Sequence, residues 1–224
     1  MSEIFNSVKG EIKDFLIKHQ DDFKLLVEIG SHFGNDTIEI KKLFPESEII
    51  CFEPDPRNIK VIKENWKSNN IAVLYELAVS DFNGKTTFHL SSGDCSFWTN
   101  DELWSKKDWS ASSSLKRPIK HTEVHPWIKF NNMIEVDCVR LDDFQPLNEK
   151  IIDFIWMDVQ GAEDLVINGA KKTLSNTRFL FTEYDNEELY ENQLNLEGIL
   201  KSLGPDWDVI SIFSNDILLK NNKI

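Results

Sequence analysis

The chain has 224 residues, of which 41% are hydrophobic and 28% are charged. These proportions are those of an ordinary globular domain, and the length suits one α/β unit, so we expect a single domain over residues 1–224. The formal net charge of −13 opposes broad contact with nucleic acid or with an anionic membrane surface. No apolar run approaches the ~20 residues of a transmembrane helix, so no membrane span is expected.

The amino terminus and the cysteines bear on the compartment. The start of the chain, MSEIFNSVKGEIKDF, lacks the basic and apolar regions of a signal peptide. The three cysteines are Cys51, Cys95 and Cys138, an odd number without the clustering that a disulfide framework or a zinc site needs. We therefore expect reduced thiols and a cytoplasmic location. The sequence leaves the oligomeric state open.

Hydrophobic periodicity predicts strands that alternate with helices. In the first half of the chain we expect a helix over 2–18, a strand over 24–29, a helix over 35–44, a strand over 49–53, a helix over 57–68 and a strand over 71–77. Residues 78–81 then enter a predicted hairpin that turns at Asn83-Gly84 and returns over 85–90. The second half predicts strands over 133–141, 151–157 and 178–184, helices over 161–174 and 193–203, and a last hairpin of 208–213 with 216–220. This order is typical of a doubly wound α/β sheet with right-handed crossovers.

Residues 92–130 interrupt the alternation. The segment holds four of the seven tryptophans, which are Trp98, Trp104, Trp109 and Trp127. It also holds a group of positive charges within an acidic protein, namely Lys106, Lys107, Lys116, Arg117 and Lys120. A long irregular insertion in a compact domain is usually a lid or a binding loop, so we expect it to cover the ligand site. Its tryptophans either cover a ligand or pack the insertion onto the sheet.

The most informative stretch is 25–53, LLVEIGSHFGNDTIEIKKLFPESEIICFE. It reads as strand, glycine turn, helix and second strand, which is a nucleotide-binding half of an α/β sheet. The strands end in Glu28 and Glu53, and Glu53 can accept hydrogen bonds from a ribose diol. Gly30 and Gly34 match the acidic-x-Gly-x-x-x-Gly turn of S-adenosylmethionine enzymes, where Glu28 suits a cationic ligand. The spacing fails the dinucleotide fingerprint G-x-G-x-x-G, so an NAD oxidoreductase is a weaker alternative, as is a βαβ unit without ligand.

Six motifs in order along the chain resemble the FkbM family of S-adenosylmethionine-dependent methyltransferases. They are VEIGSHFG at 27–34, FEPDP at 52–56, AVSD at 78–81, ASSSL at 111–115, VRLDD at 139–143 and IDFIWMDVQGAE at 152–163. The resemblance implies a class I methyltransferase (Rossmann-like) fold, a seven-stranded sheet with its last strand antiparallel. It also implies methyl transfer, in known members mostly to hydroxyl oxygens of sugars, polyketides or related metabolites. Trp156 stands where a lysine is common and Gln160 where a glutamate is common, so the acceptor cannot be carried over.

Within this fold we expect the cofactor S-adenosylmethionine to lie along the first turn and the second strand end. Glu28 and Gly30 face its methionine part, Glu53 holds the ribose, and Pro54 and Asp55 shape the adenine edge. Asp81 meets the adenine amine, and Ala78 meets the adenine through its backbone. The full predicted set is Glu28, Gly30, Ser31, His32, Gly34, Asn35, Asp36, Thr37, Glu53, Pro54, Asp55, Ala78, Val79, Asp81, Ser112 and Asp158.

Catalysis requires alignment of the acceptor and a base for its hydroxyl proton. Asp158 has the best motif position for the base, and a cofactor contact or a helix cap is its alternative role. Glu183 ends the fifth main strand and points to the same opening, and His121 and His125 lie in the insertion. Asp158, Asp185 and Asn186 imitate the oxygen ligands of Mg²⁺-dependent O-methyltransferases, so a divalent metal is a less favoured alternative.

Three classes of function remain open from the sequence. The leading hypothesis is an O-methyltransferase that acts on a hydroxyl of a sugar, a glycan or a small metabolite. A nucleic-acid methyltransferase is favoured only by the lysine, arginine and tryptophan residues of the insertion. A non-catalytic cofactor-binding protein is the third, and the retained Glu28, Gly30, Glu53 and Asp158 speak against it.

Overall fold

The computed structural model describes residues 7–67, 70–97 and 108–224. Its main sheet has seven strands in the order β3-β2-β1-β7-β8-β10-β9. Five of them run parallel, and β10 is antiparallel to both of its neighbours. The strands are β1 Leu25–Ile29, β2 Glu48–Phe52, β3 Val73–Tyr75, β7 Ile152–Met157, β8 Thr177–Glu183, β9 Trp207–Ile212 and β10 Asp216–Asn221. The predicted doubly wound sheet with an antiparallel last strand is therefore confirmed.

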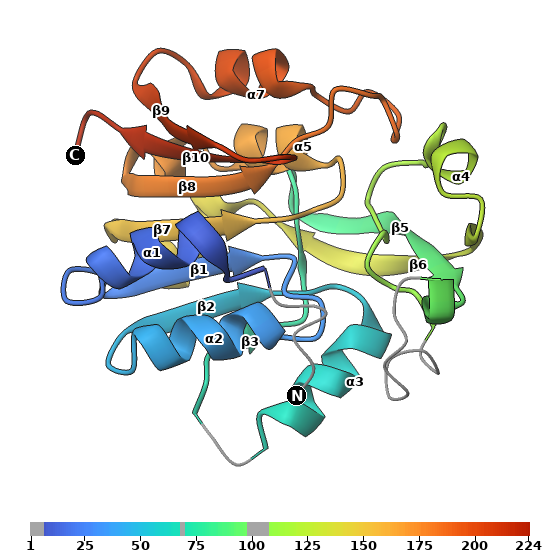
Figure 1. Ribbon diagram of the computed structural model, residues 1–224, viewed down its shortest axis with the longest axis horizontal. Helices are drawn as coiled ribbons and strands as arrows, with labels where there is room; N and C mark the ends of the chain where they lie inside the picture. The colour runs from blue at the N-terminus through green and yellow to red at the C-terminus, as the bar shows by residue number, and fades with distance from the viewer. Residues whose placement is uncertain (1–6, 68–69, 98–107) are drawn as a thin grey trace.

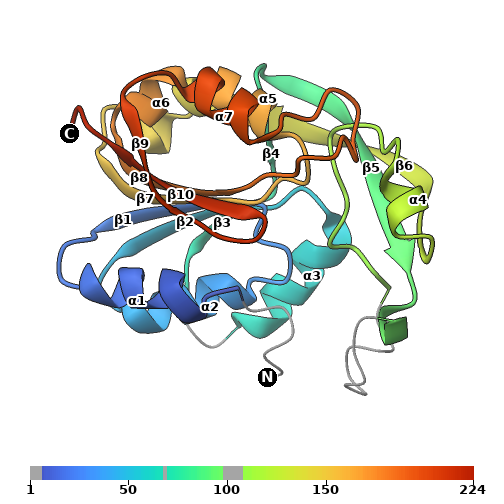
Figure 2. The same cartoon turned by 45° about the horizontal axis from the view of Figure 1, so that its top comes forward.

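Helices cover both faces of this sheet (Figures 1 and 2). One face carries α1 Gly10–Lys18, α2 Asn35–Leu43 and α3 Pro56–Asn65. The other carries α5 Glu163–Gly169, α6 Lys171–Ser175 and α7 Leu196–Leu203. Side chains of β7 alternate between the two resulting cores: Phe154 and Trp156 join the first, Ile155 and Met157 the second. Burial on both faces explains why β7 reads as a continuous apolar run.

A second sheet of three strands lies beside the carboxyl ends of the main strands (Figure 1). It consists of β4 Ala78–Val79, β5 Gly84–Gly93 and β6 Ile128–Val139 in the order β4-β6-β5. The predicted hairpin at Asn83-Gly84 is wrong, because β4 pairs in parallel with β6 and β5 pairs antiparallel with β6. Asn83 explains the difference: its side chain accepts from Arg140 N at 2.8 Å and donates to Asp143 at 2.8 Å, which ties this turn to the end of β6.

Several predicted boundaries differ from the structure. The helix expected over 2–18 begins at Gly10, whose φ of +57° breaks the helical path, and residues 1–6 lie outside the described part. The helix expected over 161–174 is two helices that are separated at Ala170. The remaining short helices are η2 Cys95–Phe97, α4 His121–Val124, η3 Leu141–Asp143 and η4 Gln145–Leu147.

The described part of the insertion is anchored to the loop that follows β8. The Tyr190 hydroxyl donates to the Ser112 carbonyl at 2.7 Å. Lys116 donates to the Asn192 carbonyl at 2.6 Å and pairs with Asp164 at 2.7 Å, and Arg117 pairs with Glu191 at 3.0 Å. Two insertion cations are thus neutralised by acids of the same chain. Trp98, Trp104, Lys106 and Lys107 lie outside the described residues.

Two further expectations concern the chain as a whole. Cys51, Cys95 and Cys138 are free and buried. Across residues 7–67, 70–97 and 108–224, no helix has the length and apolar character needed to cross a membrane.

Candidate active site

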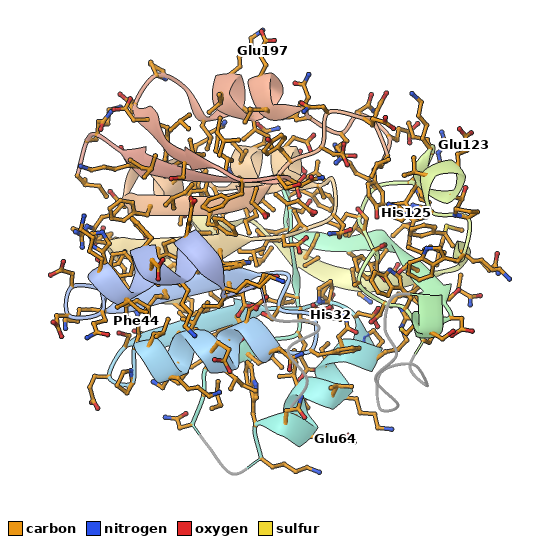
Figure 3. All side chains as sticks on the ribbon, in the orientation of Figure 1. His32, Phe44, Glu64, Glu123, His125 and Glu197 are labelled. Carbon is orange, nitrogen blue, oxygen red and sulfur yellow. The ribbon has the colours of Figure 1, made fainter. Side chains whose placement is uncertain are left out.

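A cavity of about 560 Å³ lies between the carboxyl ends of β1, β2, β7 and β8 and the insertion. Figure 3 shows two of its lining residues, His32 and His125, on the side of the sheet that faces β5 and β6, away from Phe44 at the far end of α2. Ligands bind at this edge of open α/β sheets. The predicted residues that line the cavity are Gly30, Ser31, His32, Asn35, Asp36, Glu53, Pro54, Ala78, Val79, Ser112, His121, His125, Asp158, Glu183 and Asp185. Those that do not are Glu28, Gly34, Thr37, Asp55, Asp81 and Asn186.

Gly30 allows the ends of β1 and β7 to meet at the cavity. Its φ is +89°, and a Cβ at this position would lie 1.8 Å from the carbonyl oxygen of Asp158. The Asp158 amide in turn donates to the Ile29 carbonyl at 2.9 Å. Only glycine combines this φ with this close approach, so Gly30 fixes the position of Asp158 relative to the turn.

Glu28 lies behind the turn and does not contact the cavity. Thr37 Oγ1 and Cys51 Sγ both donate to its Oε2. Burial first, and then the charge of Asp36, raise the pKa of Glu28 to about 8. Any effect of Glu28 on a cationic ligand therefore acts through the turn and not by direct contact.

The raised pKa of Glu28 predicts a pH-dependent effect of Glu28→Gln. The folded-state pKa exceeds the unfolded value of 4.5, so the protein loses stability as pH rises from 4.5 through about 8. The variant lacks this ionisable group. We expect the free energy of unfolding of the variant, relative to that of the parent protein, to increase by on the order of 2–4 kcal/mol across this window. The unfolding temperature of the variant should rise relative to that of the parent accordingly. Thermal unfolding at pH 5 and pH 8.5 measures it, and a constant difference between the two proteins contradicts the prediction.

Glu53 sits at the end of β2 and gathers three donors of the protein. Its Oε1 accepts from the Asp55 amide at 2.8 Å and from Asn58 Nδ2 at 3.3 Å, and its Oε2 accepts from the His32 amide at 2.8 Å. Burial raises the pKa of Glu53 to about 8. The carboxyl group is thus fixed at the cavity wall with some lone-pair capacity left for a ligand.

A hydrogen-bond chain joins the first turn to the insertion. His32 Nε2 lies 3.0 Å from Ser110 Oγ, and Ser110 Oγ donates to Asn58 Oδ1 at 2.7 Å. Because the serine hydrogen is used on Asn58, His32 Nε2 is the donor to Ser110. Burial lowers the pKa of His32 to about 3, so the ring is neutral. Ser110 and Asn58 were missed in the sequence, although Ser110 directly precedes the ASSSL motif.

Asn35 begins α2 and presents unused polar atoms. Its side chain is buried and lines the cavity. Among the described residues, neither Asn35 Oδ1 nor Nδ2 has a hydrogen-bond partner. Buried polar groups are rarely left unsatisfied, so Asn35 is placed to bond a ligand.

Only some of the residues predicted to contact the adenine line the cavity. Pro54, Leu77, Ala78 and Val79 line the cavity and form an apolar wall. Asp81, in contrast, is exposed and lies outside this wall, because the chain turns away after β4.

Asp55 is also outside the cavity wall. It caps α3 by accepting from the Arg57 amide at 2.9 Å and pairs with the Arg57 guanidinium at 2.7 Å. Its place in the structure is that of a helix cap.

Asp158, Gln160 and Glu183 form the polar centre of the cavity. Gln160 Nε2 donates to Asp158 Oδ1 at 2.7 Å and to Glu183 Oε2 at 2.8 Å. Burial raises the pKa of both acids, and the charge of Asp158 raises that of Glu183 further. Glu183 is therefore the acid that keeps a proton, and Asp158 is the first to ionise.

The two histidines of the insertion share the far end of the cavity. The His121 ring packs 5.1 Å from His125 and 5.2 Å from both Phe130 and Tyr190. Burial first, and then His125, lower the pKa of His121 to about 4. The ring is thus neutral at physiological pH.

The proposed Mg²⁺ ligands are not gathered at one point. Asp158 and Asp185 line the cavity, but Asn186 is exposed and does not. Within the described part of the chain, no three His, Cys, Asp or Glu side chains form a group that could hold a metal ion.

Comparison with known proteins decides the family. The profile of the methyltransferase FkbM domain matches residues 28–210. The chain is also 40% identical over 205 residues to the 2-O-methyltransferase NoeI of Sinorhizobium fredii. The aligned region covers 89% of this chain and 80% of NoeI. The chain belongs to the FkbM methyltransferase family. It is therefore a methyltransferase that uses S-adenosylmethionine, as the six motifs predicted.

More distant relatives agree with this assignment. Methyltransferase 1 of Beauveria bassiana is 24% identical over 155 residues, which is 66% of this chain and 59% of that protein. The solved structure of cofactor-bound Rv0187 from MTB has a TM-score of 0.51 at 10% identity and covers 97% of this chain and 84% of its own. At that identity the likeness shows the fold, which is that of the class I methyltransferases.

The two residues that depart from the usual FkbM pattern both line the cavity. Trp156 is buried and packs 4.4 Å from the Phe181 ring, so it belongs to the floor of the site. Gln160 holds the two acids described above. The cavity therefore differs from the common FkbM pattern at two of its lining residues.

Proposed function

We propose that this FkbM methyltransferase transfers a methyl group to a hydroxyl oxygen of a neutral sugar or similar polyhydroxylated small molecule. The observation that carries the proposal is the pair of acids, Asp158 and Glu183, which line one cavity together with the glycine turn. A 2-O-methyltransferase among its relatives, NoeI, supports transfer to oxygen.

The cofactor occupies the part of the cavity next to the glycine turn in this proposal. Gly30 and Ser31 face its methionine part, Asn35 supplies unused hydrogen-bonding atoms, and Glu53 accepts from the ribose. The apolar wall of Pro54, Leu77, Ala78 and Val79 receives the adenine. Acids that line the cavity, among them Asp158 and Glu183, suit the positively charged sulfonium.

The reaction is a direct displacement at the methyl carbon. The acceptor oxygen forms a bond to this carbon as the carbon–sulfur bond breaks, and its electron pair stays on sulfur, which becomes a neutral thioether. Asp158 accepts the hydroxyl proton. Alignment contributes most of the barrier reduction, roughly 7–11 kcal/mol, and the base contributes about 10²–10⁴-fold. His121 and Glu183 are the reserve candidates for the base, and His125 is the third.

The acceptor lies between the acids and the insertion. Trp109, Trp127, His121 and His125 give this side of the cavity an aromatic wall, which suits the apolar face of a sugar ring. The opposite wall is acidic and disfavours a phosphorylated or carboxylated acceptor. Residues 108–127 of the insertion serve as the cover, and the contacts of Ser112, Lys116 and Arg117 with the rest of the chain hold this part in place.

The alternative functions are less well supported. The neutralised Lys116 and Arg117 weaken the case for a nucleic-acid substrate. The predicted metal set is incomplete at the cavity, since Asn186 is exposed and does not line it. Three free buried thiols support a reducing compartment such as the cytoplasm.

Calorimetry tests the cofactor, and methyl transfer tests the acceptor. We expect S-adenosylmethionine and S-adenosylhomocysteine to bind and NAD not to bind. With isotope-labelled S-adenosylmethionine, we expect label in neutral glycosides and none in RNA or DNA. Binding of NAD alone, or label in nucleic acid but in no glycoside, contradicts the proposal.

Glu53→Ala is expected to weaken cofactor binding by about 1.5–3 kcal/mol, because the ribose hydroxyls and three protein donors lose their acceptor. Glu53→Gln keeps an acceptor oxygen and should lose less. Calorimetric titration with S-adenosylhomocysteine measures both, with circular dichroism to check the fold. Unchanged affinity in folded Glu53→Ala means that the ribose lies elsewhere.

A further inference from the structure

Gln160 binds two acids with one nitrogen, and this arrangement has a specific geometry. Each of the two Nε2 hydrogens has its own carboxyl oxygen, Asp158 Oδ1 at 2.7 Å and Glu183 Oε2 at 2.8 Å. Gln160 also has a φ of +52°, which is uncommon for a residue other than glycine. A strained backbone at a functional site is maintained by its surroundings, here by the two bonds that the side chain makes.

The two acids lie side by side at the cavity. One nitrogen, Gln160 Nε2, bonds both Asp158 Oδ1 and Glu183 Oε2, and the two acids stand at the ends of the neighbouring strands β7 and β8. Burial raises the pKa of both acids, and the charge of Asp158 raises that of Glu183 further, so Glu183 keeps its proton when Asp158 ionises.

We propose that this carboxyl pair recognises a vicinal diol, with the reacting hydroxyl on Asp158 and the neighbouring hydroxyl on Glu183. The proposal rests on the proposed function and names its substrate class more closely. Adjacent hydroxyls on a ring can each reach one acid, because a single amide nitrogen bonds both acids and so holds them close together. Asp158 then accepts the proton of the methylated oxygen, while Glu183 accepts a hydrogen bond from the second hydroxyl with the oxygen that its own proton does not occupy.

The rest of the cavity wall agrees with a diol on a ring. Asp185 and Asn215 line the same side and add oxygen acceptors for further hydroxyls. Trp127 and His125 line the insertion side and offer flat surfaces to the face of the ring. An acceptor with a single hydroxyl would leave Glu183 with an unmatched buried lone pair, so the site discriminates against it.

Matched acceptors test this rule directly. The probes are methyl pyranosides with a vicinal diol and their monodeoxy analogues, each incubated with isotope-labelled S-adenosylmethionine. We expect label in the diol compounds, with kcat/KM on the order of 10²-fold lower once the hydroxyl next to the methylated one is removed. Mass spectrometry of the products locates the methyl group. Equal kcat/KM for a diol and its deoxy analogue overturns the diol rule.

Variants test whether Glu183 is responsible for the preference for a diol over its deoxy analogue. In Glu183→Ala the diol should lose its advantage, so that its kcat/KM falls to that of the deoxy analogue. Glu187→Ala is the matched control, because Glu187 is an exposed acid four residues after Glu183 that does not line the cavity. Its ratio of diol to deoxy analogue should equal that of the parent.

The possible failures are distinct. A Glu183→Ala enzyme that still prefers the diol as strongly as the parent overturns the role of Glu183. If Glu183→Ala does not fold, the comparison of acceptors on the parent enzyme still decides the rule. Absence of label in every glycoside, with the cofactor bound, overturns the proposed acceptor class and the diol rule together.

Discussion

Asp158→Asn is expected to lower methyl transfer by about 10²–10⁴-fold while cofactor affinity remains close to that of the parent enzyme. The variant keeps the size of the side chain and its place beside Gly30 but cannot take a proton. A base that acts only in the transition state affects turnover and not ground-state binding. Rapid single-turnover transfer, combined with calorimetric titration of the cofactor, separates the two quantities.

The pH profile of the parent enzyme provides an independent check. Burial raises the pKa of Asp158 above its ordinary value of 3.8, so activity should fall with acid at a pH above that value, as the carboxylate protonates. In Asp158→Asn this acid limb should be absent. A variant that keeps full turnover, or that loses the cofactor instead, would move the base to Glu183 or to a histidine of the insertion.

Gly30→Ala is expected to destabilise the fold strongly, because it combines a backbone clash with a left-handed φ. Its Cβ would lie 1.8 Å from the Asp158 carbonyl oxygen, and the residue would still need a φ of +89°. Either β1 and β7 separate at the cavity or the variant does not fold. We expect a loss of more than about 4 kcal/mol, measured by urea unfolding, together with loss of cofactor binding.

Gly204→Ala is the matched control for this prediction. Gly204 has a φ of +90°, nearly that of Gly30, but a Cβ there meets no atom within 4 Å. Its cost should be the backbone strain alone, about 1–3 kcal/mol. Equal losses in the two variants would mean that φ, and not the contact with Asp158, makes Gly30 necessary.

The main sheet could be predicted from the sequence because the patterns that define its strands and helices are local. Strands β1, β2 and β7 are buried apolar runs, and a turn residue or a cap marks each helix that follows, such as Gly34 before α2 or Asp55 before α3. The three-stranded sheet could not, because β4 and β5 both pair with β6, which begins only at Ile128, after the insertion. No local pattern specifies such a partner, and the Asn83-Gly84 turn suggested a nearer one.

The candidate site, like the fold, could be predicted where the information is local in the sequence and could not where it depends on distant contacts. Residues within a motif, such as Glu53 and Asp158, were placed at the cavity by their strand ends. Contacts between distant residues were not predicted: Ser110, which was missed, meets His32 across 78 positions, and Gln160, noted only as a departure from the family pattern, meets Glu183 across 23. Asp81 was expected at the adenine from its motif, but the path of the chain after β4 puts it at the surface.

A crystal structure with S-adenosylhomocysteine tests the central claim most directly, since it places the cofactor relative to the acids. We predict the ribose hydroxyls within hydrogen-bond distance of Glu53, a polar contact to Asn35, and the sulfur atom facing Asp158 across the cavity. A product molecule bound outside this cavity, or bound within it with its sulfur turned away from Asp158, would contradict the assignment of the reaction centre.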